Sequence, residues 1–206
     1  MSANTNIRRR VLSTLAAAAG ALAIVPGVAA ASTTWFGSSL DHSPANSGNT
    51  CADFGVQAGT CTHVGSDYPG FSGRAQAPVS GTITALKLIP AGPMTFTFEV
   101  VKAHVASDFQ SGSAEAVQRS RQITVPGPTQ DQLDNGVYPT VTVPVHLAVK
   151  KGQELAINTS SNTAEYCSDG TPGQLLFSPL LAPGLGFQNS SGVDDCLLLF
   201  RAVIHH

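Results

Sequence analysis

Charged residues are scarce in this chain of 206 residues. Lys and Arg number 11 and Asp and Glu number 13, which together make up 12% of the chain. After residue 31 the remaining basic residues are scattered along the sequence rather than arranged in a stripe. Because binding to nucleic acid needs a basic patch that neutralises phosphates, this pattern excludes nucleic acid as a partner.

Sequence motifs for common catalytic or metal sites are also missing. The nearest approach to the G-x-S-x-G motif of serine hydrolases is the segment 70–73, which is one residue short. The cysteines do not show C-x2-C spacing and no histidine follows at a regular offset, which argues against zinc. We therefore predict no catalytic residues of the serine-hydrolase type and no zinc site.

The chain has one long run of apolar residues, and it lies near the N-terminus. Three arginines at positions 8–10 precede an apolar run from Val11 to about Val25, and residues 29–31 give an A-x-A cleavage pattern. The run is too short to span about 30 Å of hydrocarbon comfortably. Residues 1–31 are therefore predicted to be a signal peptide of either the general secretory or the twin-arginine route. The remainder is predicted to be secreted, with no membrane span.

Residues 32–206 are predicted to form a single extracellular domain. This part has 175 residues with eight basic and thirteen acidic side chains, a formal charge of −5. Its length suits one domain with a substantial core. Few charges, many Gly, Ser, Thr and Pro residues and little helical periodicity favour an all-β class.

Alternating apolar residues predict several strands. In Pro93–Val101, Phe96 and Phe98 face one way while Thr97 and Glu99 face the other, which predicts a strand with one buried face. Thr140–Val149 and the following "QELAIN" are predicted strands as well. Further candidates are Thr33–Ser39, Thr82–Ile89, Ala116–Val125, Gln174–Phe177 and Cys196–Ile204, of which the last is expected to be one central strand.

Turn formers and proline complete the predicted fold. Pro144 predicts an edge strand or a bulge, and "TQDQLDNG" predicts one helical turn capped by Thr129 and ended by Gly136. Residues 38–81 are the least periodic stretch and are predicted to be a long ordered loop. The whole pattern predicts a two-sheet antiparallel sandwich that is jelly-roll-like.

The four cysteines predict two disulfides, because an even number in an exported chain is typical of an oxidised framework. Three pairings are possible. The short loop between Cys51 and Cys61 favours their pairing, which would leave Cys167 to pair with Cys196. The sequence alone leaves the pairing open.

Three weaker site hypotheses follow from the polar and aromatic residues. If Cys167 pairs with Cys196, Asp169 lies beside Asp194 and Asp195, whose carboxylates suit calcium. Trp35 and Tyr68 are candidate platforms for a sugar ring or a similar ligand. Glu99 and a second carboxylate could hydrolyse a glycan, since glycosidases use two carboxyl groups.

The stretch "VHLAVKKGQELAINTSSNTAEYCSDGTPGQLLF" resembles uncharacterised exported bacterial β-sandwich proteins. In these proteins a strand that ends in a Lys/Gly turn leads into "GQELAI", and a cysteine pair closes the end. The resemblance implies a structural framework without catalytic residues. We therefore expect a non-catalytic extracellular binding or surface-associated module, whose partner is an extracellular glycan or a cell-surface component. The alternatives are a glycan-active hydrolase that uses Glu99 and a purely structural envelope component.

Overall fold

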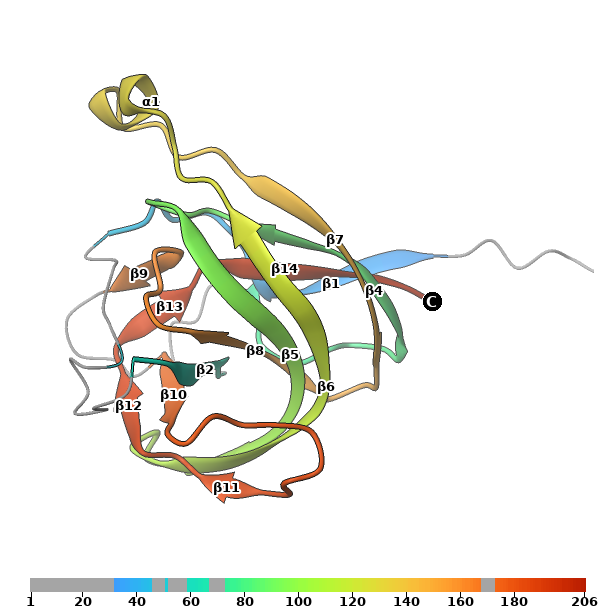
Figure 1. Ribbon diagram of the computed structural model, residues 1–206. Coiled ribbons are helices and arrows are strands. Elements are labelled where there is room, and N and C mark those ends of the chain that lie inside the picture. Colours follow the sequence, from blue (N-terminus) through green and yellow to red (C-terminus); the bar gives the residue numbers. More distant parts are fainter. Residues whose placement is uncertain (1–31, 46–50, 52–58, 67–72, 168–172) are drawn as a thin grey trace, which may run out of the picture. The chain divides into compact units, whose positions relative to one another are not determined.

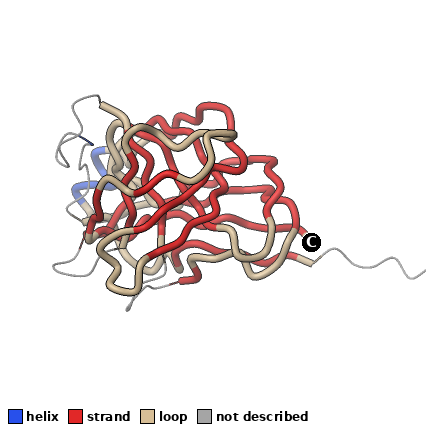
Figure 2. The backbone as a smooth tube through the Cα atoms, turned by 90° about the horizontal axis from the view of Figure 1, so that it is seen from below, coloured by secondary structure: helices blue, strands red, loops and turns tan. Residues whose placement is uncertain are grey.

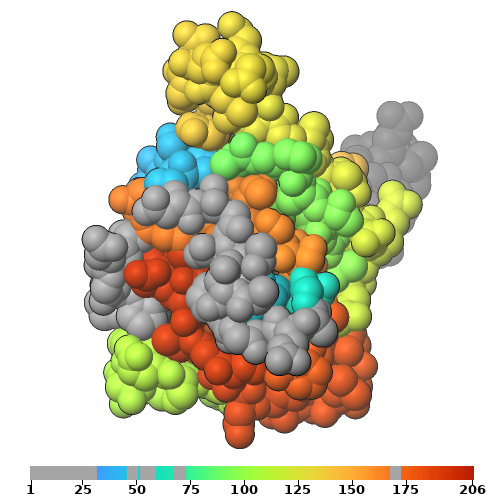
Figure 3. All heavy atoms as spheres, turned by 60° about the vertical axis from the view of Figure 1, so that its left-hand side comes forward, coloured from blue at the N-terminus to red at the C-terminus, as the bar shows by residue number. Residues whose placement is uncertain are grey.

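The computed structural model describes residues 32–45, 51, 59–66, 73–167 and 173–206, and all of these lie in the compact unit of residues 31–206. Strands dominate the described residues (Figure 2), and the short helix α1 (Gln130–Asp134) projects from the body of the domain (Figures 1 and 3). No helix among the described residues has the length and apolar character needed to cross a membrane. The predicted signal peptide lies outside the described residues.

The strands form two larger sheets and one small sheet, and every pairing between named strands is antiparallel. The five-stranded sheet has the order β3 (Gly73–Arg74), β1 (Thr33–Ser38), β14 (Phe200–His205), β4 (Gly81–Leu88) and β7 (Val141–Val149). The seven-stranded sheet has the order β11 (Gln188–Asn189), β6 (Gly112–Val125), β5 (Met94–Val105), β8 (Glu154–Thr159), β2 (Cys61–Gly65), β10 (Gln174–Phe177) and β12 (Gly192–Asp194). The small sheet pairs β13 (Cys196–Leu198) with β9 (Glu165–Cys167).

The main hydrophobic core lies between the two larger sheets. The five-stranded sheet contributes residues such as Leu86 and Phe200, and the seven-stranded sheet contributes Phe96, Phe98 and Ile157. The rings of Phe96 and Phe200 meet edge to face with centroids 5.3 Å apart, an arrangement that aromatic pairs prefer. This core matches the alternation of apolar residues in the sequence.

The seven-stranded sheet is curled, because the long strands β5 and β6 bend along their length (Figure 1). Its outer, convex face meets the main core, and its inner, concave face encloses a second cluster that includes Val101, Ala156, Phe177 and Leu181. Residues 98–101 of β5 are therefore buried on both faces. The prediction of one buried face for this strand is wrong here, since the curl covers the second face as well.

Most predicted strands are confirmed, with ends that move by a few residues. β7 is the edge strand that Pro144 predicted, and the register of its pairing with β4 shifts between Ile83 and Ala85. Helix α1 also forms as predicted, because Thr129 and Gln132 make a reciprocal capping box at its start.

Two predictions about strands are wrong. Residues 196–204 form two strands, β13 and β14, which belong to different sheets. Strand pairing is interrupted at Leu199, whose N–H donates to the Ala164 carbonyl at 2.8 Å. The predicted loop over residues 38–81 contains β2 in the interior of the seven-stranded sheet. The residues of β2, "CTHVG", gave little apolar alternation, and so the strand was not predicted.

Candidate functional site

A buried ion pair lies on the concave face of the seven-stranded sheet. Glu99 is fully buried, and its Oε1 accepts a hydrogen bond from Arg119 Nε at 2.5 Å and from Asn158 Nδ2 at 3.1 Å. Burial raises the pKa of Glu99, while Arg119 and then Asn158 act in the opposite direction. Its Oε2 is also buried and makes no hydrogen bond in the described part of the chain. Arg119 thus stabilises a carboxylate that would otherwise be costly to bury.

An irregularity in β6 places Arg119 opposite Glu99. The strand register pairs Thr97 with Gln122 but Glu99 with Arg119, so two residues of β6 oppose the single residue Phe98. The Phe98 N–H donates to the Ser120 hydroxyl at 2.9 Å, which satisfies the backbone at this point. Bulges of this kind redirect side chains, and here the bulge directs Arg119 toward the concave face.

The ion pair continues into a chain of hydrogen bonds. The Thr62 hydroxyl donates to Asn158 Oδ1 at 2.5 Å and accepts from the Leu181 N–H at 3.0 Å. Arg119 Nη2 donates to the Leu181 carbonyl, so the same residue closes both ends of the network. Asn158 and Arg119 are thereby held in fixed orientations.

Beside this network is a hollow of about 290 Å³, which we call the hydroxyl hollow. The residues that line it include Thr60, Thr97, Arg119, Gln122, Asn158 and Ser160. Among the described residues, the side chains of Thr60, Thr97, Gln122 and Ser160 make no hydrogen bond to another protein group. Polar groups with unused hydrogen-bonding capacity therefore gather around two polar groups of fixed orientation.

A second, larger groove of about 520 Å³ also involves Arg119. It lies between β6 and β7, where Arg121 and His146 add cationic or titratable groups and Ile123 and Leu147 add apolar surface. The Ala148 N–H donates to Gln118 Oε1 at 2.9 Å across the two strands. Arg119 therefore stands between this groove and the hydroxyl hollow.

A second carboxylate shares the concave face with Glu99. In the pairing of β5 with β8, Glu99 faces Ala156 and Val101 faces Glu154, so Glu99 and Glu154 point to the same side of the sheet as diagonal neighbours. Both side chains are buried, and Glu154 Oε1 accepts from Gln76 at 3.2 Å. Glu99 is fully buried, whereas Glu154 is nearly so but also lines a separate hollow with Gln76 and His104.

Trp35 lies on the outer face of the five-stranded sheet, where 36% of its surface is exposed. The guanidinium carbon of Arg201 lies 4.2 Å from the centre of the Trp35 ring, within range of a cation–π contact. Strand pairing places Trp35 in one row with Val203, Ala85 and Pro144. Tyr68, the other predicted platform, lies outside the described residues.

The cysteines pair as Cys51–Cys61 and Cys167–Cys196, which confirms two disulfides. Asp194 and Asp195 lie beside Cys196, whereas Asp169 lies outside the described residues. Burial, and then the charge of Asp195, raise the pKa of Asp194 to about 7. Calcium at these aspartates stays a prediction.

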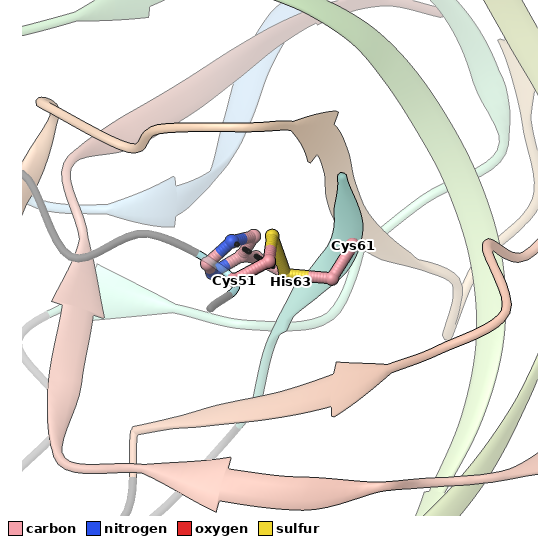
Figure 4. A group of neighbouring side chains, drawn as sticks. All are labelled: Cys51, Cys61 and His63. Atoms are coloured by element: carbon pink, nitrogen blue, oxygen red, sulfur yellow. Dashed lines mark hydrogen bonds between the residues drawn. A yellow bond between two sulfur atoms is a disulfide. The ribbon is translucent and has the colours of Figure 1, made fainter. Parts of the chain in front are cut away.

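The Cys51–Cys61 disulfide has a histidine beside it (Figure 4). His63 Nε2 lies 3.4 Å from Cys61 Sγ, and His63 Nδ1 lies 2.9 Å from Gln174 Oε1. The Gln174 amide donates to Glu165 Oε2 at 3.1 Å, so its oxygen is the atom that faces His63 and His63 Nδ1 carries the proton. Burial lowers the pKa of His63 to about 4, which leaves the ring neutral near pH 7.

No family model matches this chain, and neither a curated protein nor a solved structure matches it. Neither His63 nor Arg119 was among the predicted site residues. His63 could have been found from its position two residues after Cys61, because alternate residues of a strand share a face. Arg119 carries no comparable signal, since its contact with Glu99 depends on the bulge in β6.

Proposed function

We propose that this protein is exported and serves as a non-catalytic extracellular binding module for a hydroxyl-rich ligand, such as a sugar unit of a glycan. One observation carries the proposal. Four polar residues, whose side chains make no hydrogen bond within the described part of the protein, line the same hollow as Arg119 and Asn158. A ligand that both donates and accepts hydrogen bonds would satisfy them together.

The chemistry of the hollow favours an uncharged ligand. Hydroxyl and amide groups donate and accept hydrogen bonds, as sugar hydroxyls do. The charge of Arg119 is balanced by Glu99 at 2.5 Å, so this ion pair adds no net charge beside the hydroxyl hollow. The volume of about 290 Å³ is near the lower end for small-molecule sites, which suits one sugar unit. Because the network already fixes Arg119 and Asn158, less side-chain freedom is lost on binding.

Export and surface association belong to the same proposal. The N-terminal charge and apolar pattern fits a secretory signal, and two disulfides suit an oxidising compartment. A jelly-roll-like sandwich is the architecture we infer for the domain. A purely structural envelope component is the expectation if no ligand binds.

A glycan hydrolase remains the second candidate because Glu99 and Glu154 share one face of the sheet. Both carboxyl groups are buried, and neither lines the hydroxyl hollow. A glycosidase must bring its two carboxyl groups to the scissile bond. The burial of both side chains therefore favours binding over hydrolysis.

A glycan array on the purified protein, followed by titration calorimetry with the best ligand, tests the proposal. Replacing Thr97 by Val and Gln122 by Leu together should weaken binding at least about tenfold, since each lost hydrogen bond costs about 1 kcal/mol. The matched control is Thr142→Val, an exposed threonine on the outer face of β7 that should leave affinity unchanged.

Other results of these experiments would overturn the proposal or favour the hydrolase. Loss of binding in Trp35→Ala with an intact affinity in the hollow variant would move the site to the outer face and overturn the proposal. Release of new reducing ends from a glycan would support the hydrolase. An array without any bound glycan would contradict both.

A further inference from the structure

Three residues of metal-binding types, two cysteines and one histidine, meet at the first disulfide. One ligand atom from each of Cys51, Cys61 and His63 lies within 4.8 Å of the others, and all three residues are buried. In Figure 4 the imidazole ring of His63 lies directly beside the sulfur atoms. The second disulfide, Cys167–Cys196, has carboxylates nearby but no histidine in the corresponding groups.

The distances resemble those between ligands of a tetrahedral zinc ion. Zinc bonds to sulfur at about 2.3 Å and to nitrogen at about 2.0 Å, which separates two such ligands by about 3.5 Å in tetrahedral geometry. Cys61 Sγ and His63 Nε2 are 3.4 Å apart. The Thr159 carbonyl oxygen lies 3.2 Å from Cys51 Sγ, so an oxygen atom is also close to this group. The bond between the two sulfur atoms must break and the atoms must separate for an ion to enter.

The partners of His63 hold its ring as the ring of a metal-binding histidine is held. Metal-binding histidines commonly donate their other ring N–H to an oxygen, which fixes the tautomer and the ring orientation. His63 Nδ1 donates to Gln174, and Gln174 is held by Glu165. Asn162 also donates to the same Glu165 oxygen at 3.0 Å. The Nε2 lone pair is therefore already directed at the sulfur atoms.

We propose that the reduced form of this protein binds one zinc ion through Cys51, Cys61 and His63, and that the disulfide is the oxidised, metal-free form of the same site. A dithiol or phosphine reductant supplies two electrons, and two protons are taken up as the S–S bond breaks to give two thiols. On binding Zn²⁺ the thiols release two protons, and two Zn–S bonds form. Oxidation by a disulfide-forming reagent reverses both steps.

Charge balance explains the choice of zinc. Two thiolates and a neutral imidazole around a divalent ion give a site with no net charge, which a buried position favours. A monovalent ion with the same ligands would leave a buried negative charge. Thiolate and imidazole ligands also suit zinc, whereas calcium and magnesium prefer oxygen ligands.

Refolding the full chain from denaturant with a phosphine reductant, with and without zinc, tests the proposal without requiring an ion to enter a closed core. Bound zinc is measured after dialysis, and the fold is followed by near-ultraviolet circular dichroism. The wild type and the Cys167→Ser/Cys196→Ser variant should each retain one zinc. The Cys51→Ser/Cys61→Ser variant should retain none, and His63→Gln should bind at least about tenfold more weakly.

Cobalt substitution of the wild type gives a readout that needs no variant. Tetrahedral ligand-field bands together with a sulfur-to-cobalt band are expected for the proposed ligands. Equal zinc affinity in the wild type and in His63→Gln would overturn the proposal. So would a reduced wild type that fails to fold with zinc, or cobalt spectra without sulfur coordination.

Discussion

Two buried polar networks lie on opposite faces of the curled sheet and meet at neighbouring residues of β2. Thr62 belongs to the concave network of Glu99, Arg119 and Asn158, whereas His63 belongs to the network of Gln174 and Glu165. The first contains an ion pair whose arginine is partly exposed beside a hollow. The second contains a fully buried, neutral histidine beside a disulfide. The two networks therefore differ in their surroundings, since one borders a hollow and the other borders a disulfide.

The largest expected difference between the networks is the effect of His63 on the free energy of unfolding at acidic pH. The pKa of His63 is lowered from 6.5 to about 4, so the unfolded chain takes up a proton at a higher pH than the folded protein does. Stability from this group is therefore present above pH 6.5 and is lost as pH falls toward 4. The loss in free energy of unfolding is at most about 3 kcal/mol.

The titration of Asp194 changes stability in the opposite direction. Asp194 must therefore be replaced before the effect of His63 can be measured. Its pKa is raised from 3.8 to about 7, so its contribution to stability rises as pH falls from 7 toward 4. Denaturant unfolding of the oxidised Asp194→Asn variant should show the fall in stability that His63 causes over this range, and Asp194→Asn/His63→Gln should lack that fall. An equal slope in both variants would contradict a neutral His63.

The concave network should respond to loss of its cation. Arg119→Met leaves Glu99 buried without its charge partner and should lower the free energy of unfolding by about 2–3 kcal/mol, below the value for a fully buried pair because Arg119 is partly exposed. The loss should shrink in acid, where the carboxyl group becomes protonated. Urea titrations at two pH values measure both effects.

A double variant separates the two explanations of that loss. Adding Glu99→Leu to Arg119→Met removes the unpaired charge and should recover most of the lost stability. If the double variant is as unstable as the sum of its parts, packing by the arginine stem rather than charge pairing holds this face together.

A smaller effect is expected where the networks meet. Thr62→Val removes a hydroxyl that donates to Asn158 and accepts from Leu181, and it should cost about 1–3 kcal/mol because both partners are buried. The pH profile set by His63 should not change. Thermal melts at several pH values would show coupling between the networks if that profile moved with the variant.

The sequence predicted the strands well where one face alternates clearly, as in β5 and β7. It also predicted the all-β class and indicated the two disulfides. These features are local, or they depend on a short separation along the chain. Strand β2 was missed because its central position comes from pairing with β8 and β10, which no local pattern records.

The candidate sites were harder to predict because they depend on long-range geometry. The alternation of residues places Glu99 on a threonine-rich face and so indicates a surface residue, yet the curl of the sheet buries it completely. Its partner Arg119 is brought opposite by a bulge, and Asn158 comes from a different strand. The spacing rules for zinc sites did not indicate His63 either. Of the proposed ligands, Cys51 lies ten residues before Cys61 and His63 only two residues after it.

The most direct test of ligand binding at the concave face is nuclear magnetic resonance with ¹⁵N-labelled protein and the best ligand from the glycan array. Chemical shifts should change for the backbone amides of Thr97, Gln122, Asn158 and Ser160, which surround the hydroxyl hollow. Changes confined to the outer face around Trp35 and Val203 would contradict the account.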